Sequence, residues 1–296
     1  MSRLSLRGVG KTYGLGPVTR EVVRDCSFDV EDGKFTVMIG PSGAGKSTLI
    51  RLIGGFERPT TGEILADGRR VTGPGRDRQV VFQETALFPW MTADENLLYG
   101  PKARGEMGPA ARRRADDLLD RVGLRSFRHR YPRHLSGGMQ RRAELGRAMV
   151  NDPGVMILDE PFRGLDALTK QLMLEYYADL ALEQRRTNFF VTTDVDEAIF
   201  LADRLLVMTH IPMRVRAVIE VDLPRPRDLT ALVADDHANA IKLQVLTLLH
   251  EEAMKAFGAG AGRTAAADFI AAFQQRSSAR PPAGQAPPPE HRDPAR

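Results

Sequence analysis

Residues 40–48 read GPSGAGKST, and they match the phosphate-binding pattern G-x-x-x-x-G-K-[ST] through Gly40, Gly45, Lys46 and Ser47. Glycines in such a loop let backbone N–H groups face an anion where larger side chains would block the approach. A helix that starts at the end of the loop also points its positive N-terminal end toward the phosphates. The pattern therefore predicts that the chain binds a nucleoside triphosphate.

The segments on either side favour this interpretation over a glycine-rich turn that binds nothing. Residues 34–40, KFTVMIG, form an apolar run typical of a strand, and residues 46–55 have the apolar spacing of a helix. We expect Lys46 to reach the β- and γ-phosphates of ATP and the Ser47 hydroxyl to hold Mg²⁺. The predicted loop consists of Gly40, Pro41, Ser42, Gly43, Ala44, Gly45, Lys46, Ser47 and Thr48.

The composition is that of an ordinary globular chain. Of 296 residues, 42% are hydrophobic and 27% are charged, which is enough for a core in one large domain or two small ones. The single cysteine, Cys26, cannot form an internal disulfide, which suits a reducing cytosol. The N-terminus has no apolar segment like that of a signal peptide, and no apolar run approaches the ~18 residues of a membrane span. We therefore expect any membrane role to come through a partner protein.

The charge pattern does not indicate nucleic-acid binding. The net charge is +4, and arginines cluster at residues 112–114 and again between residues 125 and 133. The first cluster lies in a predicted helix, residues 109–122, that also carries three aspartates, as is typical of a solvated helix face. Because no recognition motif accompanies the arginines, we expect no nucleic-acid partner.

The second half of the chain alternates between strands and helices, which predicts a parallel sheet covered on both faces. Strand-rich segments precede it, followed by a helical region that has the character of an insertion. In that region Thr92 and Glu95 form a capping-box pattern. The predicted strands of the second half are 154–160, 188–193 and 204–210, and the predicted helices are 136–150, 167–184 and 194–202.

Beyond residue 210 the pattern changes. Residues 214–224 predict an edge strand, and residues 235–257 carry the apolar stripe of an amphipathic helix. We expect a shorter helix at residues 265–273 and disorder in the proline-rich segment that follows Arg276. The predicted organisation is a nucleotide-binding domain over residues 1–210 with a helical subdomain at about 84–150, an extension over 211–275 and a tail over 276–296.

A carboxylate pair, Asp159 and Glu160, follows the apolar run at residues 155–158. Because parallel strands end at the sheet edge where nucleotides bind, Asp159 is placed to hold Mg²⁺ through water. Glu160 is then placed to polarise an attacking water, and general-base assistance is typically worth ~10² to 10⁴ in rate. The pair predicts hydrolysis as well as binding.

A glycine-containing segment, LSGGMQRR at residues 135–142, narrows the class. We expect Ser136 to cap a helix and Gly137 and Gly138 to leave backbone N–H groups open to a phosphate. With the phosphate loop and the later Asp-Glu pair, residues 3–210 resemble the ATP-binding subunits of ABC transporters. That resemblance implies a P-loop NTPase core of the α/β class, a parallel sheet with flanking helices. It also implies an N-terminal antiparallel β subdomain, a helical insert subdomain and a C-terminal extension.

In this family two subunits sandwich two ATP molecules. The resemblance implies that Leu135, Ser136, Gly137 and Gly138 of one subunit close over the γ-phosphate held by the other. Asp166, in GLDALT, is similar to the aspartate that communicates between the two sites.

Two further positions match the family. Tyr13, in GKTYG, is similar to the aromatic residue that stacks on adenine; a plain surface tyrosine is the alternative. Gln83 is similar to the glutamine that senses Mg²⁺ and the γ-phosphate and hinges the helical insert. The implied Mg²⁺ ligands are Ser47, Gln83 and Asp159.

Two places depart from the family pattern. Phe162, Arg163, Gly164, Leu165 and Asp166 stand where the family usually reads F-G-A-L-D. Thr193 stands where the family has its switch histidine, which contacts the γ-phosphate. A threonine hydroxyl can donate one hydrogen bond, but it is shorter than an imidazole and never cationic. Thr193 joins Glu160 and Gln83 in the implied catalytic set, and weak hydrolysis is an open alternative.

Three segments resemble importers of the nitrate, sulfonate and taurine group: FQETALFPWMTADENL at residues 82–97, LSGGM at 135–139 and VDLPRPRD at 221–228. These are bacterial complexes with a periplasmic substrate-binding protein and a membrane permease. Residues 87–91 would suit a groove for a permease helix, and packing of the insert onto the core is the alternative.

The preferred interpretation is an ABC ATPase in the cytoplasm, peripheral on the inner face of the cell membrane. It would dimerise on ATP, as a homodimer or heterodimer, and drive import of a small anion such as nitrate, sulfonate or taurine through a separate permease. A nucleotide-gated subunit with weak hydrolysis is one alternative. A non-transport ABC protein that acts on nucleic acid is another, but such proteins usually carry two ATPase halves or a coiled-coil insert.

Overall fold

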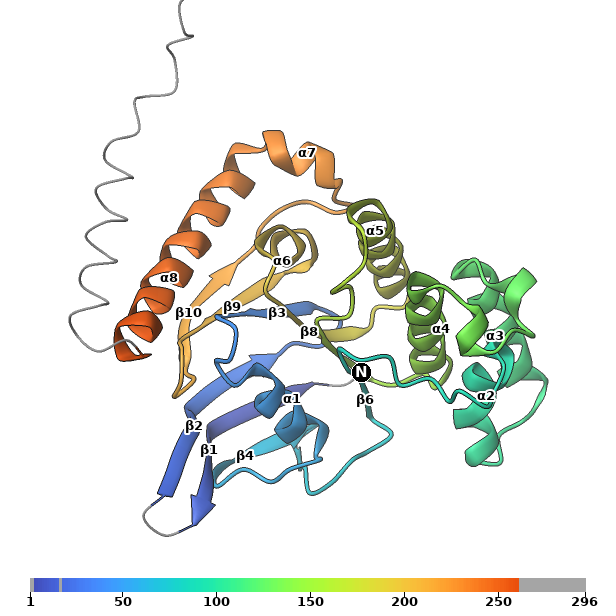
Figure 1. The fold of residues 1–296 in the computed structure, drawn as a ribbon, viewed down its shortest axis with the longest axis horizontal. Helices are drawn as coiled ribbons and strands as arrows, with labels where there is room; N and C mark the ends of the chain where they lie inside the picture. Colours follow the sequence, from blue (N-terminus) through green and yellow to red (C-terminus); the bar gives the residue numbers. More distant parts are fainter. Residues whose placement is uncertain (1–2, 16–17, 261–296) are drawn as a thin grey trace, which may run out of the picture. The chain divides into compact units, whose positions relative to one another are not determined.

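Within the residues that the computed structural model describes, 3–15 and 18–260, a six-stranded sheet has the order β10-β9-β3-β8-β7-β6 (Figure 1). Five neighbouring strands pair in parallel, and β10 pairs antiparallel with β9 at one edge, where the sequence predicted an edge strand. The strands are β3 (Phe35–Ile39), β6 (Arg78–Val81), β7 (Val155–Asp159), β8 (Thr187–Thr192), β9 (Arg204–Met208) and β10 (Val215–Glu220).

A second sheet is antiparallel and packs on the first through helix α1 (Lys46–Gly54). One buried cluster unites Leu49 of the helix with Leu4 and Ile64 of the antiparallel sheet and Ile157 of β7. This sheet is the predicted N-terminal β subdomain. Its order is β2-β1-β4-β5, with β1 (Leu4–Leu15), β2 (Val18–Val30), β4 (Thr61–Ala66) and β5 (Arg69–Arg70).

Successive side chains along the buried strands point to opposite faces of the sheet and so contribute to two separate cores. On β7, Val155 and Ile157 join the cluster around α1, whereas Met156 and Leu158 join a cluster on the opposite face. Burial on both faces explains why these strands are continuous apolar runs in the sequence. The helices that contribute to the second cluster include α5 (Ala167–Glu183) and α6 (Val195–Leu201) (Figure 1).

The helical insert forms between β6 and β7, as predicted. Its first helix has the expected capping box: the Glu95 N–H donates to Thr92 Oγ1 at 3.3 Å, and the Thr92 N–H donates to the Glu95 carboxylate at 2.7 Å. Arginines of the insert pair with its own acids, since Arg112 and Arg128 lie 2.7 Å and 2.6 Å from the Asp94 carboxylate. The insert contains α2 (Ala93–Ala103), α3 (Pro109–Arg121), the 3-10 turns η1 (Arg125–Phe127) and η2 (Pro132–His134), and α4 (Gly137–Val150).

The chain beyond β9 is tied back to helix α6 by an arginine. The Arg227 guanidinium donates to the carbonyl oxygens of Ile199, Phe200 and Ala202, which end that helix, and to two carbonyl oxygens of its own segment. A planar fork of N–H donors can serve several acceptors at once, which gives Arg227, the second arginine of VDLPRPRD, a structural role. Helices α7 (Leu229–Ala234), which the sequence did not predict, and α8 (Asp236–Gly260) follow.

Residues 1–253 form one compact unit, and a second unit starts at Met254. Of the second unit the structure describes only residues 254–260, the end of α8, so the predicted helix at 265–273 and the predicted tail at 276–296 lie outside the described residues. The division at residue 210 stays a prediction. In the described part of the chain, no helix is both long and apolar enough to cross a membrane.

Candidate functional site

The phosphate-binding loop has the backbone conformation that its glycines predict. Gly43 and Gly45 have positive φ angles of 74° and 104°, which L side chains rarely adopt. At Gly45 a Cβ atom would also lie 2.8 Å from Cγ1 of Val22. Helix α1 begins after Gly45 without a side-chain cap, so its first backbone N–H groups are open to an anion.

Lys46 is buried inside this loop. Its Nζ donates to the carbonyl oxygens of Gly40 at 2.9 Å and Pro41 at 3.0 Å, and it lies 4.0 Å from Oε1 of Glu160. Burial lowers the pKa of the ammonium, although the neighbouring carboxylates of Glu160 and Asp159 act in the opposite direction. Its present acceptors are mostly neutral, so phosphate oxygens would be stronger partners for the same charge.

Ser47 and Asp159 come together at the C-terminal end of β7. The Ser47 side chain interacts with the buried Asp159 carboxylate. Burial raises the pKa of Asp159, and the interaction with Ser47 partly opposes that shift. Hydroxyl and carboxylate oxygens are the ligand types that Mg²⁺ takes, and a divalent cation would compensate a buried carboxylate. The two side chains therefore fit an Mg²⁺ ion bound with a nucleotide.

Glu160 has an uncommon backbone conformation. Its φ is 44°, in the left-handed region, and its N–H donates to the carbonyl oxygen of Val191 at 2.8 Å. Such residues cluster at functional sites, where the surroundings hold them in place. The carboxylate is nearly buried, and its Oε2 accepts a hydrogen bond from Nη1 of Arg163 at 3.0 Å.

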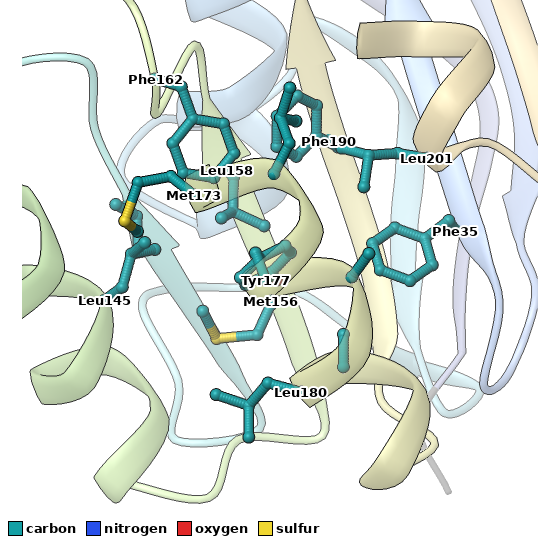
Figure 2. Packing of buried hydrophobic residues seen from close by; sticks show 14 of the residues in the cluster. Phe35, Leu145, Met156, Leu158, Phe162, Met173, Tyr177, Leu180, Phe190 and Leu201 are labelled. Carbon is teal, nitrogen blue, oxygen red and sulfur yellow. The ribbon is translucent and has the colours of Figure 1, made fainter. Parts of the chain in front are cut away.

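Phe162 anchors the loop that carries Glu160 and Arg163. Figure 2 shows its ring among buried side chains of the second core. The ring centroid lies 6.3 Å from that of Tyr177 and 5.9 Å from that of Phe190. Because a buried aromatic ring fixes its own backbone, the residues on both sides of Phe162 are presented from a rigid base.

Thr193 is exposed just after β8 and lines a small hollow of about 180 Å³ together with Glu160. The backbone around it is fixed by its neighbours. The Thr192 hydroxyl donates to the Glu197 carboxylate at 2.6 Å and accepts from the Asp194 N–H at 3.0 Å. The structure thus places Thr193 in the same hollow as Glu160.

Lys170 of α5 supports this loop. Its Nζ lies 2.6 Å from Asp194 and 3.2 Å from Glu197. Burial opposes the charged form of Asp194, but the hydrogen bond from Lys170 lowers its pKa below the ordinary range. Burial raises the pKa of Glu197. Asp194 and Glu197, at the start of α6, therefore share one lysine that comes from α5.

Gln83 lies just after β6 with an exposed side chain. Within the described residues no hydrogen bond links its amide to Ser47 or Asp159. Its backbone is held by Arg141 of α4, which donates to the carbonyl oxygens of Gln83 and Phe82. The backbone at Gln83 is thus in direct contact with the insert, and the hinge role of this residue stays a prediction.

Tyr13, on β1, stands beside the phosphate loop. Its hydroxyl donates to Glu57 at 2.6 Å and also interacts with the Thr48 side chain. Burial and the hydrogen bond to Glu57 raise the pKa of the phenol, which stays neutral. The Lys11 ammonium lies 4.9 Å from the ring centroid. A half-exposed ring next to the loop is in position to meet the base of a nucleotide.

The signature segment caps its own helix. Ser136 Oγ accepts from the Met139 N–H at 3.3 Å, and a Cβ atom at Gly137 would meet no atom within 4 Å. In residues 3–15 and 18–260 no hydrogen bond joins the signature to the phosphate loop. Asp166 likewise caps α5, where it accepts from the Thr169 N–H at 3.0 Å.

The structure therefore gathers the phosphate loop, Asp159 and Glu160 in one place, with Thr193 beside Glu160. The signature and Asp166 lie at helix starts, and in the described part of the chain no hydrogen bond joins either of them to that loop. Sequence reasoning missed the side chains that hold these loops, namely Arg141 and Lys170. Arg163 could be singled out from the sequence, because it departs from the family pattern.

Comparisons with known proteins agree with this geometry. A family described as "ABC transporter" matches residues 23–163. The chain is 40% identical over 230 residues to the aliphatic sulfonates import ATP-binding protein SsuB of Bacillus licheniformis, covering 78% of this chain and 89% of the relative. It is also 40% identical over 245 residues to the nitrate import ATP-binding protein NrtD of Synechococcus elongatus, covering 82% and 89%.

A solved structure, the dimeric post-hydrolysis state of the ATP-binding cassette MJ0796 bound to ADP and Pi, superimposes with a TM-score of 0.65 at 30% identity. It covers 75% of this chain and all of the solved one. Sequence, fold and the arrangement of the phosphate loop with the Asp-Glu pair all agree: this chain belongs to the ABC transporter family and is one of its ATPases.

Proposed function

We propose that this chain is the ATP-binding and ATP-hydrolysing subunit of a bacterial importer for a small anion. One observation carries the proposal: the open N-terminus of α1 and the buried Lys46 lie beside the Ser47–Asp159 pair and Glu160. This arrangement combines phosphate binding, Mg²⁺ binding and a base in one site.

Each residue has a distinct role in this proposal. The backbone N–H groups of residues 40–48 cradle the phosphates, and Lys46 exchanges its carbonyl partners for phosphate oxygens. Ser47, Asp159 and Gln83 would hold Mg²⁺, which supplies charge neutralisation on the phosphates when bound. Glu160 accepts a proton from the attacking water. Tyr13 stacks on adenine, from its position beside Thr48.

Dimerisation would complete the site. The open backbone at Gly137 and the absence of hydrogen bonds, within the described residues, from Leu135–Gly138 to the phosphate loop favour a role toward a second subunit. The dimeric structure of MJ0796 supports the same arrangement. Asp166, at the start of α5, would then link the two sites.

A groove between the insert and the segment 74–79, which leads into β6, supports docking of a permease. It has a volume of about 690 Å³ and is lined by Phe88, Tyr99 and Arg147. The ring of Phe88 lies 4.5 Å from that of Tyr99 and 5.6 Å from that of Trp90, which is 68% exposed. Leu87 is buried in the core, which favours the packing alternative for that residue. Exposed aromatic rings beside a groove suit an apolar partner helix.

The names of the relatives support a small anion as the transported solute. Two of them are named for import of aliphatic sulfonates and of nitrate, which favours a small anion such as nitrate, a sulfonate or taurine. Such a system requires a membrane permease and a periplasmic binding protein. The subunit would lie on the inner face of the cell membrane.

Glu160→Gln tests the proposal. The amide keeps the shape of the side chain but cannot accept a proton, so hydrolysis should stop while ATP binding persists. ATP with Mg²⁺ should then drive the variant into dimers detectable by light scattering. Phosphate release equal to that of the wild type would refute the assignment of Glu160 as the base.

A second candidate function is a nucleotide-gated subunit with weak hydrolysis. The exposed Thr193 beside Glu160 favours it, because the hydroxyl cannot carry positive charge to a γ-phosphate. A wild-type phosphate release rate close to the background measured without protein would support this alternative over the first.

A further inference from the structure

The two departures from the family pattern lie in the same place. Arg163 and Thr193 both line the small hollow that contains Glu160. Thr193 stands where the family has a histidine, which can be cationic, and Arg163 adds a guanidinium, which is always cationic. Arg163 belongs to a different segment from Thr193, so only the fold brings the two substitutions together.

In this hollow the Arg163 side chain is directed toward Glu160, the proposed base. Its Nη1 lies 3.0 Å from Oε2 of Glu160, and Phe162, buried beside it, fixes the loop. The side chain is nevertheless 59% exposed. Within the described residues the guanidinium makes no other hydrogen bond, so its remaining N–H groups are available to a further acceptor.

The other cation of the hollow is already committed. Lys170 is held by Asp194 at 2.6 Å and Glu197 at 3.2 Å. Lys46 reaches Glu160 from its other oxygen, Oε1, at 4.0 Å and belongs to the phosphate loop. Arg163 is therefore the cation that can approach a terminal phosphate from the side of Thr193.

We propose that Arg163 acts as an internal substitute for the missing switch histidine, donating to the γ-phosphate in the hollow where Thr193 cannot carry charge. The guanidinium is planar, permanently charged and rich in donors, which suits phosphate oxygens. In phosphoryl transfer the protein acts mainly by placing positive charge on the transferring group. One N–H group orients the Glu160 carboxylate while others contact the phosphate.

This inference rests on the proposed hydrolytic function, because it requires Glu160 to be the base. It also explains why Arg163 forms an ion pair with Glu160. An ion pair with Glu160 keeps the guanidinium beside the site before a nucleotide arrives, which reduces the entropy lost on engaging a phosphate. A clamp that merely blocks Glu160 would have the opposite effect on the rate.

The test is a mutant cycle with Arg163→Gln, Thr193→His and the double variant, on the full chain with ATP and Mg²⁺. Arg163→Gln should lower kcat by about 10- to 100-fold and change KM for ATP by less than about threefold. Arg163→Lys should recover part of the loss. Thr193→His should raise kcat more in the Arg163→Gln background than in the wild type, because the imidazole would replace the lost donor.

Binding gives a readout that does not depend on turnover. ADP with orthovanadate mimics the transferring phosphate, and its affinity should fall about 10-fold or more in Arg163→Gln, whereas ATP affinity should not. Arg113→Gln is the matched control, since Arg113 is exposed on α3 and away from the hollow. It should change neither quantity.

Two results would overturn the proposal. Hydrolysis by Arg163→Gln at or above the wild-type rate would identify Arg163 as a restraint on Glu160. A loss of the same size whether Arg163→Gln is made in the wild type or in the Thr193→His variant would show that the two positions act independently. Failure of the hydrolytic function itself is separate: the wild type would then release phosphate no faster than the background, or Glu160→Gln would keep the wild-type rate, whatever the behaviour of Arg163.

Discussion

Nη1 of Arg141, on helix α4, lies 2.9 Å from the carbonyl oxygen of Phe82 at the end of β6. The same guanidinium donates to the carbonyl oxygen of Gln83 and pairs with Glu144 at 2.6 Å. Residues on the helical insert therefore hold the backbone of the glutamine proposed to sense the nucleotide. Any rotation of α4 must move Gln83, which couples the insert to the site.

Replacing Arg141 with Met should destabilise the fold and impair hydrolysis. The arginine is 4% exposed, and its loss leaves the buried Glu144 carboxylate without its main partner. Removing one member of a buried pair typically costs about 3 to 5 kcal/mol. Arg141→Lys should retain charge but lose the fork, and so keep more stability than Arg141→Met while still lowering kcat. Denaturant titration and phosphate release test both effects. Unchanged kcat in both variants would argue against the coupling.

Lys46→Ala should weaken ATP binding by at least about tenfold, since a charge-assisted hydrogen bond contributes about 1.5 to 3 kcal/mol. A nucleotide that binds only the folded state raises the melting temperature. We expect Mg²⁺ and ATP to raise the melting temperature of the wild type more than that of this variant at the same nucleotide concentration. An equal rise in both would refute the assignment of the phosphate loop.

Asp159→Asn should separate stability from function. Because burial holds the folded pKa of Asp159 above its unfolded value, folding favours the protonated carboxyl. The charged form therefore destabilises the fold at neutral pH, and this penalty fades as the pH falls through the raised pKa. The nucleotide-free variant should melt above the wild type at neutral pH, by a margin that shrinks toward acid.

The same variant should lose hydrolysis, because an amide is a poor ligand for Mg²⁺ in place of a carboxylate. Melting curves across a pH series, with phosphate release at neutral pH, measure both. A variant that melts below the wild type at neutral pH would show that the Asp159 charge stabilises the empty site.

Local patterns in the sequence were enough to predict the sheet, the insert and the phosphate loop. Each depends on neighbours along the chain: the apolar run at residues 34–40, the capping box at Thr92 and the glycines of the loop. The family and its α/β fold are confirmed by the comparisons. The roles of the individual site residues stay predictions.

Contacts between distant segments could not be predicted in this way. Arg141 and Phe82 are 59 residues apart, and a single arginine in an amphipathic helix normally indicates an exposed position. Arg227, whose guanidinium binds carbonyl oxygens at the end of α6, entered the sequence analysis only as part of VDLPRPRD, a segment that resembles the importer group. The apolar run at residues 87–91 gave no sign that Leu87 is buried and Trp90 exposed, because both are apolar.

Trp90→Glu should release the permease without harming the fold. The indole is 68% exposed and packs at the edge of the groove against Phe88, so a charge there meets solvent in the free subunit but an apolar partner in the complex. We expect the melting temperature and basal ATP hydrolysis to stay close to wild type. Copurification with the permease and stimulation by transport should be lost.

Leu243→Glu is the matched control, since Leu243 on α8 is also 68% exposed but lies outside the groove. Both variants add the same charge at the same exposure, so only a difference between them reports on docking. Loss of permease binding in Trp90→Glu alone, at equal melting temperatures, supports the groove as the docking site. A fall in melting temperature confined to Trp90→Glu would instead assign the ring to packing of the insert, and the permease would then have to bind elsewhere.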